Sequence, residues 1–476
     1  MSIISIWFMG FVLCVLFLLA LGHRLLPEGR QAAADRLIML AASFFFMGFV
    51  DWRFALILAL LSVVTWLSVK HQKLSAFGVI FALLCLAYFK YTNFFIGSFL
   101  RLLGRPAHDA LAILLPLGVS FYTFSAISYI ADVRRGKIAP RSLSQVALYL
   151  SFFPKVTSGP IQRSSDFFAQ TDKPAAIGLS SLSEGAQIYV FGMFKKLVLA
   201  DRLSVFVNQV FATPYAFSSV TVLFAVIAYS LQIYFDFSGY SDMSVGVARM
   251  LGIRLPRNFN LPYLSHNVTE FWKRWHISLS SWLQDYLYIS LGGSRKGTTR
   301  TYVNLTLVML LGGLWHGASG NYLIWGLMHG LALAVHKLFM GKTGSAQKTA
   351  SLPCRILSVL GTYAFICVTW VFFRAQTTAQ ALTILSCLLP GKSGIFHPYF
   401  WLFFALTAYL FCAALAALCT KERTLSPRRQ NTSWVQGFYP AFDLSSFKGL
   451  FLFFVLCGLT LALAYTGGSP FIYGAY

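Results

Sequence analysis

The stretch LLGGLWHGASGNYLIW, residues 310–325, places one histidine, His316, among apolar and small side chains. An imidazole at membrane depth needs a polar partner, water or a substrate, because an unsatisfied polar group in hydrocarbon costs several kcal/mol. His329 follows on the next apolar segment, and His276 lies upstream in the stretch FWKRWH, residues 271–276. Three imidazoles therefore bracket one apolar region, and His316 is the first candidate for a functional residue.

The composition of the whole chain is that of a membrane protein. Of 476 residues, 57% are hydrophobic and 11% are charged, whereas about a quarter of a soluble globular domain is charged. A spanning helix needs roughly 20 residues, so we predict an all-α polytopic membrane protein with roughly eleven transmembrane helices plus re-entrant ones. The apolar runs lie at 3–22, 37–50, 54–69, 75–89, 111–131, 187–199, 221–235, 303–314, 321–339, 356–373, 400–419 and 447–465.

The charge of the chain indicates its binding partners, and its cysteines indicate no metal site. The net charge of +23 comes from 38 Lys and Arg against 15 Asp and Glu, an excess typical of cytoplasmic loops that face anionic membrane lipids. Nucleic acid is the weaker interpretation. The first apolar run has no basic residue before it, while His23, Arg24 and Arg30 follow it, which favours a retained helix with its N-terminus outside over a cleaved signal. The eight cysteines are scattered singly without metal-ligand spacing, which indicates packing roles.

Two segments depart from the spanning pattern. Residues 152–163 read FFPKVTSGPIQR, and their two prolines and glycine break any helix. Broken backbone at membrane depth is tolerated where protein or water satisfies it, so we expect this segment to line a cavity. From Tyr234 onward the composition changes, and residues 236–300 interleave charged side chains with tryptophans. We expect an amphipathic, interface-lying region that handles a polar substrate.

The histidines each have two interpretations. His316 has the right chemistry for a general base that takes a proton from an incoming hydroxyl, so that the oxygen attacks an activated acyl carbon. A structural histidine bonded to a carbonyl is the more common role of a single buried imidazole, and the neighbours Trp315 and Gly317 alone do not overturn it. His276 either orients substrate or His316, or is an interfacial histidine. For His329, packing or a bond to another site residue is favoured.

Two carboxylates, Asp236 and Asp242, stand six residues apart in the stretch YFDFSGYSD. Intramembrane carboxylates usually pair with a base or line a watered cavity. We expect a structural ion-pair network rather than direct catalysis, with Arg249, Arg254 or Lys273 as the partner.

The remaining polar groups allow two kinds of ligand. A zinc site made by His276, His316 and His329 is conceivable, but their spacing matches no ligand template and no metal is predicted. A basic rim could hold the phosphates of a nucleotide-bearing acyl donor, although positive-inside topology would place similar residues there. The rim consists of Arg254, Arg257, Lys273, Arg274, Arg295 and Lys296.

Several motifs in one order resemble a known family. They are LPLGVSFYTF (115–124), FFP (152–154) with SGP (158–160), YFDFSGYSDM (234–243), EFWKRWHISLS (270–280), DYLYI (285–289) with LGG (291–293), and GLWHG (313–317). With these motifs the chain is identified as a member of the membrane-bound O-acyltransferase (MBOAT) family, in its bacterial branch of alginate O-acetylation proteins. Peptidoglycan and cellulose acetylation proteins and teichoic acid D-alanyl transferases are relatives. SPFIY (469–473) is similar to the ending of alginate-type members.

The resemblance implies the fold and the site. It implies one transmembrane acyltransferase domain over residues 1–476 with a motif core at 111–336, arranged around a central funnel or tunnel. His316 is then the catalytic histidine, as general base or acyl relay, with His276 beside it. The residues expected to bind substrate are Asp236, Lys273, Arg274, Asp285 and Trp315.

The resemblance also implies the reaction. Acetyl groups would move from a cytoplasmic donor across the bacterial inner membrane for O-acetylation of an exported or cell-wall polysaccharide. No permanently bound cofactor is implied; the donor is acetyl-CoA or an acyl carrier protein, and the partners are a periplasmic acetyltransferase and the polysaccharide acceptor. A membrane transporter or export channel, or a non-catalytic subunit of an export complex, is the alternative. The polymer and the roles of His329 and His266 stay open.

Overall fold

The described part of the chain is helical almost throughout. In the computed structural model it comprises residues 3–105, 111, 113–343, 351–410, 442–444 and 446–467, and the SPFIY motif lies outside it. The helices fall into two compact units, one formed by Met1–Tyr189 with Tyr240–Pro256, the other by Val190–Gly239 with Arg257–Tyr476. The all-α prediction is confirmed for the described residues, in which the one isolated bridge pairs Phe217 with Ile395.

Seven helices among the described residues are long and apolar enough to cross a membrane, and Phe400–Leu410 and Phe447–Leu463 are shorter apolar helices. The chain is therefore a multi-pass membrane protein. The expected number of roughly eleven spans is not reached within these residues. Run 111–131 is cut short because its helix begins only at Val119, after Pro116 and Gly118. Run 187–199 passes from an α-helix into a π-helical turn.

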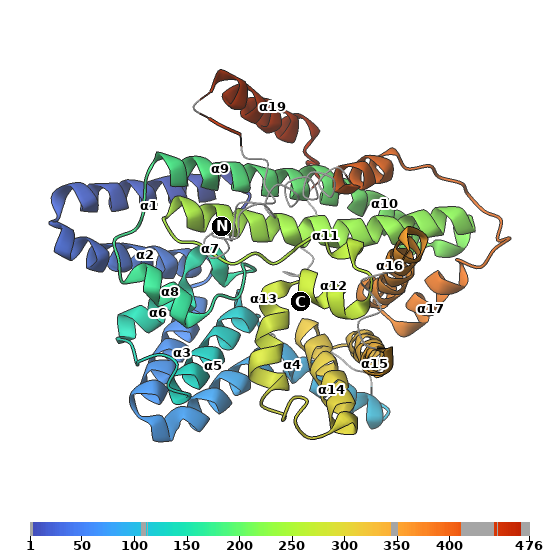
Figure 1. Ribbon diagram of the computed structural model, residues 1–476, viewed down its shortest axis with the longest axis horizontal. Helices are drawn as coiled ribbons and strands as arrows, with labels where there is room; N and C mark the ends of the chain where they lie inside the picture. Colours follow the sequence, from blue (N-terminus) through green and yellow to red (C-terminus); the bar gives the residue numbers. More distant parts are fainter. Residues whose placement is uncertain are drawn as a thin grey trace. The chain divides into compact units, whose positions relative to one another are not determined.

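The first unit packs short buried helices against four long ones. Its long helices expose many large apolar side chains, as expected of surfaces that face lipid. Helix α6 packs on α2 and α3, and α4 packs on α5 (Figure 1). The helices are α1 (Ile6–Leu25), α2 (Glu28–Val50), α3 (Trp52–Lys70), α4 (Ser75–Leu102), α5 (Val119–Arg134), α6 (Leu143–Ser151), α7 (Phe153–Val156), α8 (Ser164–Thr171) and most of α9 (Leu179–Met193).

The helix-breaking segment 152–163 is buried, and a cavity of about 10 Å³ lies beside it, lined by Lys155, Tyr122 and Ser125 among others. This volume is at the lower limit for a single water molecule, so the segment lines no larger cavity among the described residues. The Lys155 ammonium lies over the rings of Tyr149 and Phe167, at 4.1 and 4.5 Å from their centroids. Burial holds the pKa of Lys155 well below its usual value.

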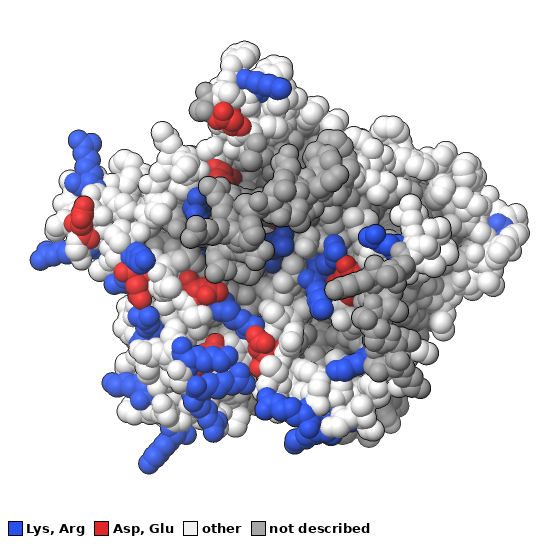
Figure 2. Space-filling view, in the orientation of Figure 1, with Lys and Arg blue, Asp and Glu red and all other residues white. Residues whose placement is uncertain are grey.

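Basic side chains gather on the surface of this unit. Arg134, Arg135 and Lys137 are exposed at the C-terminal end of α5. Figure 2 shows Lys and Arg concentrated at the lower left of the visible face, in the region where Figure 1 draws α3 and α5. Such a concentration fits the contact with anionic lipids that the net charge predicts.

The second unit is built on an aromatic core. Its elements are the π-helix η2 (Phe194–Ala200), α10 (Asp201–Ala212), α11 (Ser219–Met250), α12 (Val268–Arg274), α13 (Ile277–Trp282), the π-helix η5 (Leu283–Tyr288), α14 (Thr298–His316), α15 (Gly320–Thr343), α16 (Leu352–Arg374), α17 (Thr378–Ser386) and α19 (Phe447–Leu463). Helix α11 continues past residue 239 into the other unit. Residues 236–250, which were expected to begin an interface-lying region, therefore belong to the long helix α11, and the short elements η4 (Pro262–Leu264), α12, α13 and η5 follow it.

Helices α14 and α15 form a closely packed hairpin (Figure 1). Glycines make this possible. A Cβ at Gly313 would lie 2.2 Å from the Tyr322 carbonyl oxygen, and one at Gly326 would lie 2.4 Å from the Met309 carbonyl oxygen. Small residues let two membrane helices approach to backbone contact. The hairpin carries His316 at the end of its first helix and His329 in its second.

Candidate functional site

Helix α12 is a short helix whose N-terminus is fixed by two side chains, the N-cap Asn267 and Glu270. The Asn267 side chain accepts from the Glu270 N–H at 2.8 Å, and the Glu270 carboxylate accepts from the His266 N–H at 2.8 Å. Such bonds satisfy amides that an N-terminal turn leaves open. Glu270 also accepts from the Arg274 guanidinium at 2.7 Å, one helical turn later. The predicted substrate residue Arg274 is therefore held by its own helix.

His276 sits at the break between α12 and α13 in a strained backbone conformation. Its φ of 41° is in the left-handed region, which non-glycine residues rarely adopt. Asn258 stabilises this turn, because its carbonyl accepts from the Ile277 N–H at 2.9 Å and its side chain accepts from the Ser278 hydroxyl at 2.6 Å. The His276 ring is 1% exposed, and within the described residues neither of its nitrogens has a hydrogen-bond partner.

The environment of His276 keeps its ring neutral. Phe237 meets the ring edge-on with 4.7 Å between centroids, and Trp315 lies 6.2 Å away. Burial among these rings lowers the pKa of His276 to about 3, because the charged form would lose its hydration. A neutral imidazole has one donor and one acceptor nitrogen, so it can orient a hydroxyl or another ring.

His316 ends α14 inside an enclosure of aromatic rings. The centroids of Trp315, Trp325 and Phe373 lie 4.9, 5.2 and 5.2 Å from that of His316. The next residue must be glycine, because a Cβ at Gly317 would lie 2.2 Å from the Tyr322 ring. The Trp315 ring lies next to both histidines, with its centroid 4.9 Å from that of His316 and 6.2 Å from that of His276. The structure thus brings three predicted site residues into one aromatic cluster.

His329 is part of a hydrogen-bonded chain. The Trp272 indole N–H donates to Nδ1 of His329 at 3.3 Å, and an indole nitrogen is always a donor. Nδ1 therefore carries no proton, so the neutral ring carries it on Nε2, which donates to the Thr369 hydroxyl at 3.1 Å. Thr369 in turn donates to the Ile366 carbonyl at 2.8 Å. For His329, packing or a bond to another site residue was expected; the structure gives it hydrogen bonds to Trp272 and Thr369, neither of which was a predicted site residue.

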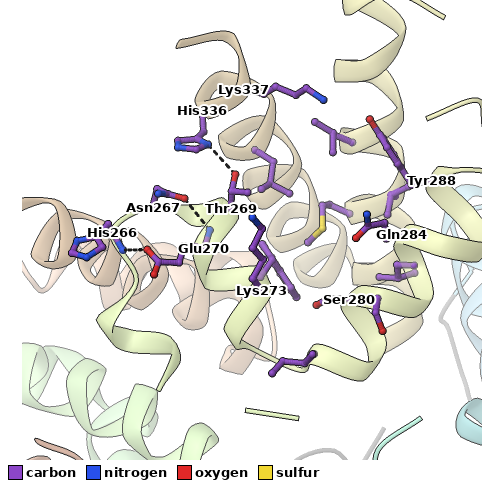
Figure 3. A pocket seen from close by; sticks show the side chains of 18 of the residues that line it. His266, Asn267, Thr269, Glu270, Lys273, Ser280, Gln284, Tyr288, His336 and Lys337 are labelled. Atoms are coloured by element: carbon purple, nitrogen blue, oxygen red, sulfur yellow. Dashed lines mark hydrogen bonds between the residues drawn. The ribbon is translucent and has the colours of Figure 1, made fainter. Parts of the chain in front are cut away.

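A cavity of about 1110 Å³ opens beside these rings. Figure 3 shows Lys273, Ser280, Gln284 and Tyr288 around it, with His336 and Lys337 from α15. Its lining is His266, Asn267, Thr269, Glu270, Trp272, Lys273, Ile277, Ser280, Ser281, Leu283, Gln284, Tyr288, Ser294, Leu305, Val308, Met309, Leu333, His336, Lys337, Arg355 and Ser358. The charged groups of this lining are the cations Lys273, Lys337 and Arg355 and the carboxylate of Glu270, so the cavity suits an anionic ligand.

Hydrogen bonds organise the polar wall of the cavity. The Lys337 ammonium donates to the Ser294 hydroxyl at 3.1 Å, and the Tyr288 and Ser294 hydroxyls are 2.8 Å apart. His336 Nδ1 lies 2.9 Å from the Thr269 hydroxyl. The sequence interpretation missed Lys337 and Arg355, which stand near helix ends and look like ordinary membrane-flanking cations.

The other predicted substrate residues lie elsewhere. Asp236 is buried in an ion pair with Lys196, 2.6 Å between Nζ and Oδ1, a partner that the sequence interpretation did not name. Asp285 lies on η5 and is not among the residues that line the cavity. Lys196 was missed, although a lysine inside the apolar run 187–199 was a visible signal. The described residues hold no group of three or more His, Cys, Asp or Glu placed to bind a metal.

Comparison with known proteins places this site in a family. The model of the membrane-bound O-acyltransferase family matches residues 48–379. The chain is 41% identical over 358 residues to the "Probable alginate O-acetylase" of Pseudomonas putida, covering 71% of this chain and 72% of that protein. It is 38% identical over 345 residues to the peptidoglycan O-acetyltransferase of Helicobacter pylori, covering 67% and 64%.

A more distant relative is the teichoic acid D-alanyltransferase of Bacillus subtilis, 27% identical over 286 residues, with 57% of this chain and 72% of that protein covered. The matched region contains the two-histidine cluster, the cavity and the hairpin that carries them. This chain belongs to the membrane-bound O-acyltransferase family and is a multi-pass membrane enzyme of that family.

Proposed function

We propose that this chain transfers acetyl groups from cytoplasmic acetyl-CoA across the bacterial inner membrane for O-acetylation of an exported or cell-wall polysaccharide of the alginate or peptidoglycan type. The observation that carries the proposal is the enclosure of His316, with His276 on the same Trp315 ring. The identities of 41% and 38% to proteins named as alginate and peptidoglycan acetylating enzymes support the substrate class.

His316 acts as the general base. Its ring removes the proton of an acceptor hydroxyl, the oxygen attacks the thioester carbonyl, and the carbon–sulfur bond breaks. The thiolate then takes the proton from the imidazolium, which restores the neutral ring. Three aromatic rings have their centroids within 5.2 Å of that of His316, which is 4% exposed, and an environment with little water strengthens polar interactions. If the acetyl group rests first on a His316 nitrogen, as an acyl relay, the same ring loses it to the hydroxyl in a second step.

His276 is the orienting partner. Its neutral ring, with the pKa lowered to about 3 by burial, stays uncharged across the physiological range. A neutral ring donates one hydrogen bond, which suits the carbonyl oxygen of the donor or the acceptor hydroxyl. Removal of His276 therefore reduces the rate without removing the base.

The large cavity is the donor site in this proposal. Lys273, Lys337 and Arg355 face the phosphates of coenzyme A, and ammonium and guanidinium groups are common phosphate ligands. A nucleotide-bearing thioester fits this charge better than a neutral donor. An acyl carrier protein would present its own acidic surface to the same cations, and competition between the two donors distinguishes them.

The finer architecture is also part of the proposal. We infer roughly eleven spanning helices, with short re-entrant elements such as α13 and η5 around a funnel. A periplasmic acetyltransferase then passes the group to the polymer. A transporter or export channel, or a non-catalytic subunit, is the rival, and each would leave the thioester intact.

The test is transfer from labelled acetyl-CoA by purified protein in lipid nanodiscs, with a polysaccharide acceptor and a periplasmic acetyltransferase supplied. We expect His316→Ala to lower the rate at least ~100-fold, the scale of general-base catalysis, and His276→Ala to leave a small residual rate. His71→Ala, in an exposed turn, is the matched control and keeps the wild-type rate. Wild-type activity in His316→Ala would show that His316 is not the general base. If neither the wild-type protein nor any variant consumes the thioester, the transporter or non-catalytic subunit is favoured.

A further inference from the structure

One helix face leads from the large cavity to His316. Met309 of α14 lines the cavity, and His316 follows seven residues later on the same helix. Seven residues make about two turns, or about 10.5 Å, and return to nearly the same face. On α15 the order is reversed: Leu333 lines the cavity, and Trp325, eight residues before it, contacts His316. Each helix of the hairpin therefore has residues that line the cavity and, about two turns away, residues of the aromatic enclosure around His316.

The indole of Trp272 lies between these two places. One part of it lines the cavity, yet the residue is only 9% exposed. Its ring meets Trp325 edge-on at 5.7 Å, and Trp325 meets His316 in the same way at 5.2 Å. His316 itself is not among the described residues that line the cavity. An acyl group delivered from the cavity to His316 meets the Trp272 indole first.

His329 holds this indole in place. Its Nδ1 accepts the indole N–H, and the chain continues through Thr369 to the Ile366 carbonyl of α16. The His329 ring also packs edge-on against Trp272 at 5.2 Å and against Trp325 at 4.8 Å. Because the ring is wholly buried and bonded at both nitrogens, the indole has one preferred position.

We propose that Trp272 closes the inner end of the donor cavity and limits the transferred acyl group to about the size of acetyl, and that His329 is the positioning residue that keeps it closed. This rests on the proposed function, since it assumes that a thioester binds in the cavity and that its acyl group reacts at His316. A longer acyl chain would need the volume that the indole fills, and close-packed interiors yield such volume only at a cost in free energy.

The experiment compares acetyl-, propionyl-, butyryl- and hexanoyl-CoA as donors and reports the ratio of kcat/KM for butyryl to acetyl. We expect Trp272→Ala to raise this ratio at least tenfold and Trp272→Phe to raise it less. Trp282→Phe is the matched control, because Trp282 is a buried tryptophan that does not line the cavity. His329→Leu, which cannot accept the indole N–H, should move the ratio in the same direction. His329→Asn, which keeps an acceptor near the Nδ1 position, should restore it.

A purely structural role of Trp272 predicts a different result. All donors would then lose activity together, and the ratio would stay within twofold of wild type in Trp272→Ala, or in Trp272→Phe if the alanine variant does not fold. That outcome overturns the inference while wild-type acetyl transfer leaves the proposed function standing. No transfer from any donor by the wild-type protein removes both.

Discussion

The ammonium of Lys196 lies 2.6 Å from one carboxylate oxygen of Asp236, and both side chains are at most 2% exposed. Lys196 also reaches Asp201, at 2.8 Å. Lys196, which lies in the π-helix η2, thus forms ion pairs with two buried carboxylates. Asp236 precedes Phe237, whose ring packs on His276, so the ion pair anchors α11 at the level where that helix supports the site.

Removal of Lys196 should cost more stability than removal of the Asp236 charge. Lys196→Met leaves two buried carboxylates without their cation, and breaking a buried pair in this way costs roughly 3–5 kcal/mol. Asp236→Asn leaves Lys196 paired with Asp201. We expect the melting temperature in nanodiscs to fall in the order wild type, Asp236→Asn, Lys196→Met. Equal melting temperatures for the two variants would show that the second carboxylate is not held by this lysine.

The neutrality of His276 should appear in the pH dependence of stability. Its pKa is about 3 in the folded protein and 6.5 in an unperturbed chain, so the unfolded state binds more protons between these values. The free energy of unfolding therefore falls as the pH drops from 6.5 towards 3. His276→Gln has no group that takes up this proton. The free energy of unfolding of the variant should therefore fall less steeply with decreasing pH, and its slope should be smaller than that of the wild type by up to ~1.4 kcal/mol per pH unit. Parallel curves for the two proteins would show that His276 titrates normally.

The closeness of three rings agrees with the sequence interpretation. His316 stands out as a polar residue in an apolar run, and the family motifs added His276 and Trp315; the three rings meet in one cluster. The helical fold followed from the apolar runs. The number of spans was less predictable, because Pro116 and Gly118 delay the start of a helix that composition alone would extend.

The partners of charged groups were not predictable, because they depend on which helices become neighbours. Asp236 pairs with Lys196, a lysine 40 residues earlier in the chain. Arg249, one of the expected partners, binds Glu184 at 2.7 Å. The cavity combines residues from 266 to 358. Periodicity identifies the face of a helix but not the element that covers it.

The cations of the cavity should control donor affinity. Lys337→Ala and Arg355→Ala remove charge from the cavity without touching the aromatic cluster, so we expect KM for acetyl-CoA to rise several-fold while kcat changes little. The loss should shrink at high ionic strength, because salt screens exposed charges. Lys137→Ala, an exposed lysine of the other unit, is the control. A fall in kcat with unchanged KM would mean that these cations act on the chemical step instead.

The close packing of α14 on α15 should be sensitive to single methyl groups. A Cβ at Gly313 would lie 2.2 Å from the Tyr322 carbonyl oxygen, so Gly313→Ala must push the two helices apart. Overpacking of this kind costs about 1–3 kcal/mol, and we expect a lower melting temperature together with reduced acetyl transfer, since His316 ends the displaced helix. Gly361→Ala is the matched control, because nothing lies within 4 Å of its Cβ position in α16. That change should leave stability unchanged or raise it, as alanine favours a helix over glycine. If Gly313→Ala is as stable and as active as Gly361→Ala, the two helices are not packed in backbone contact at Gly313.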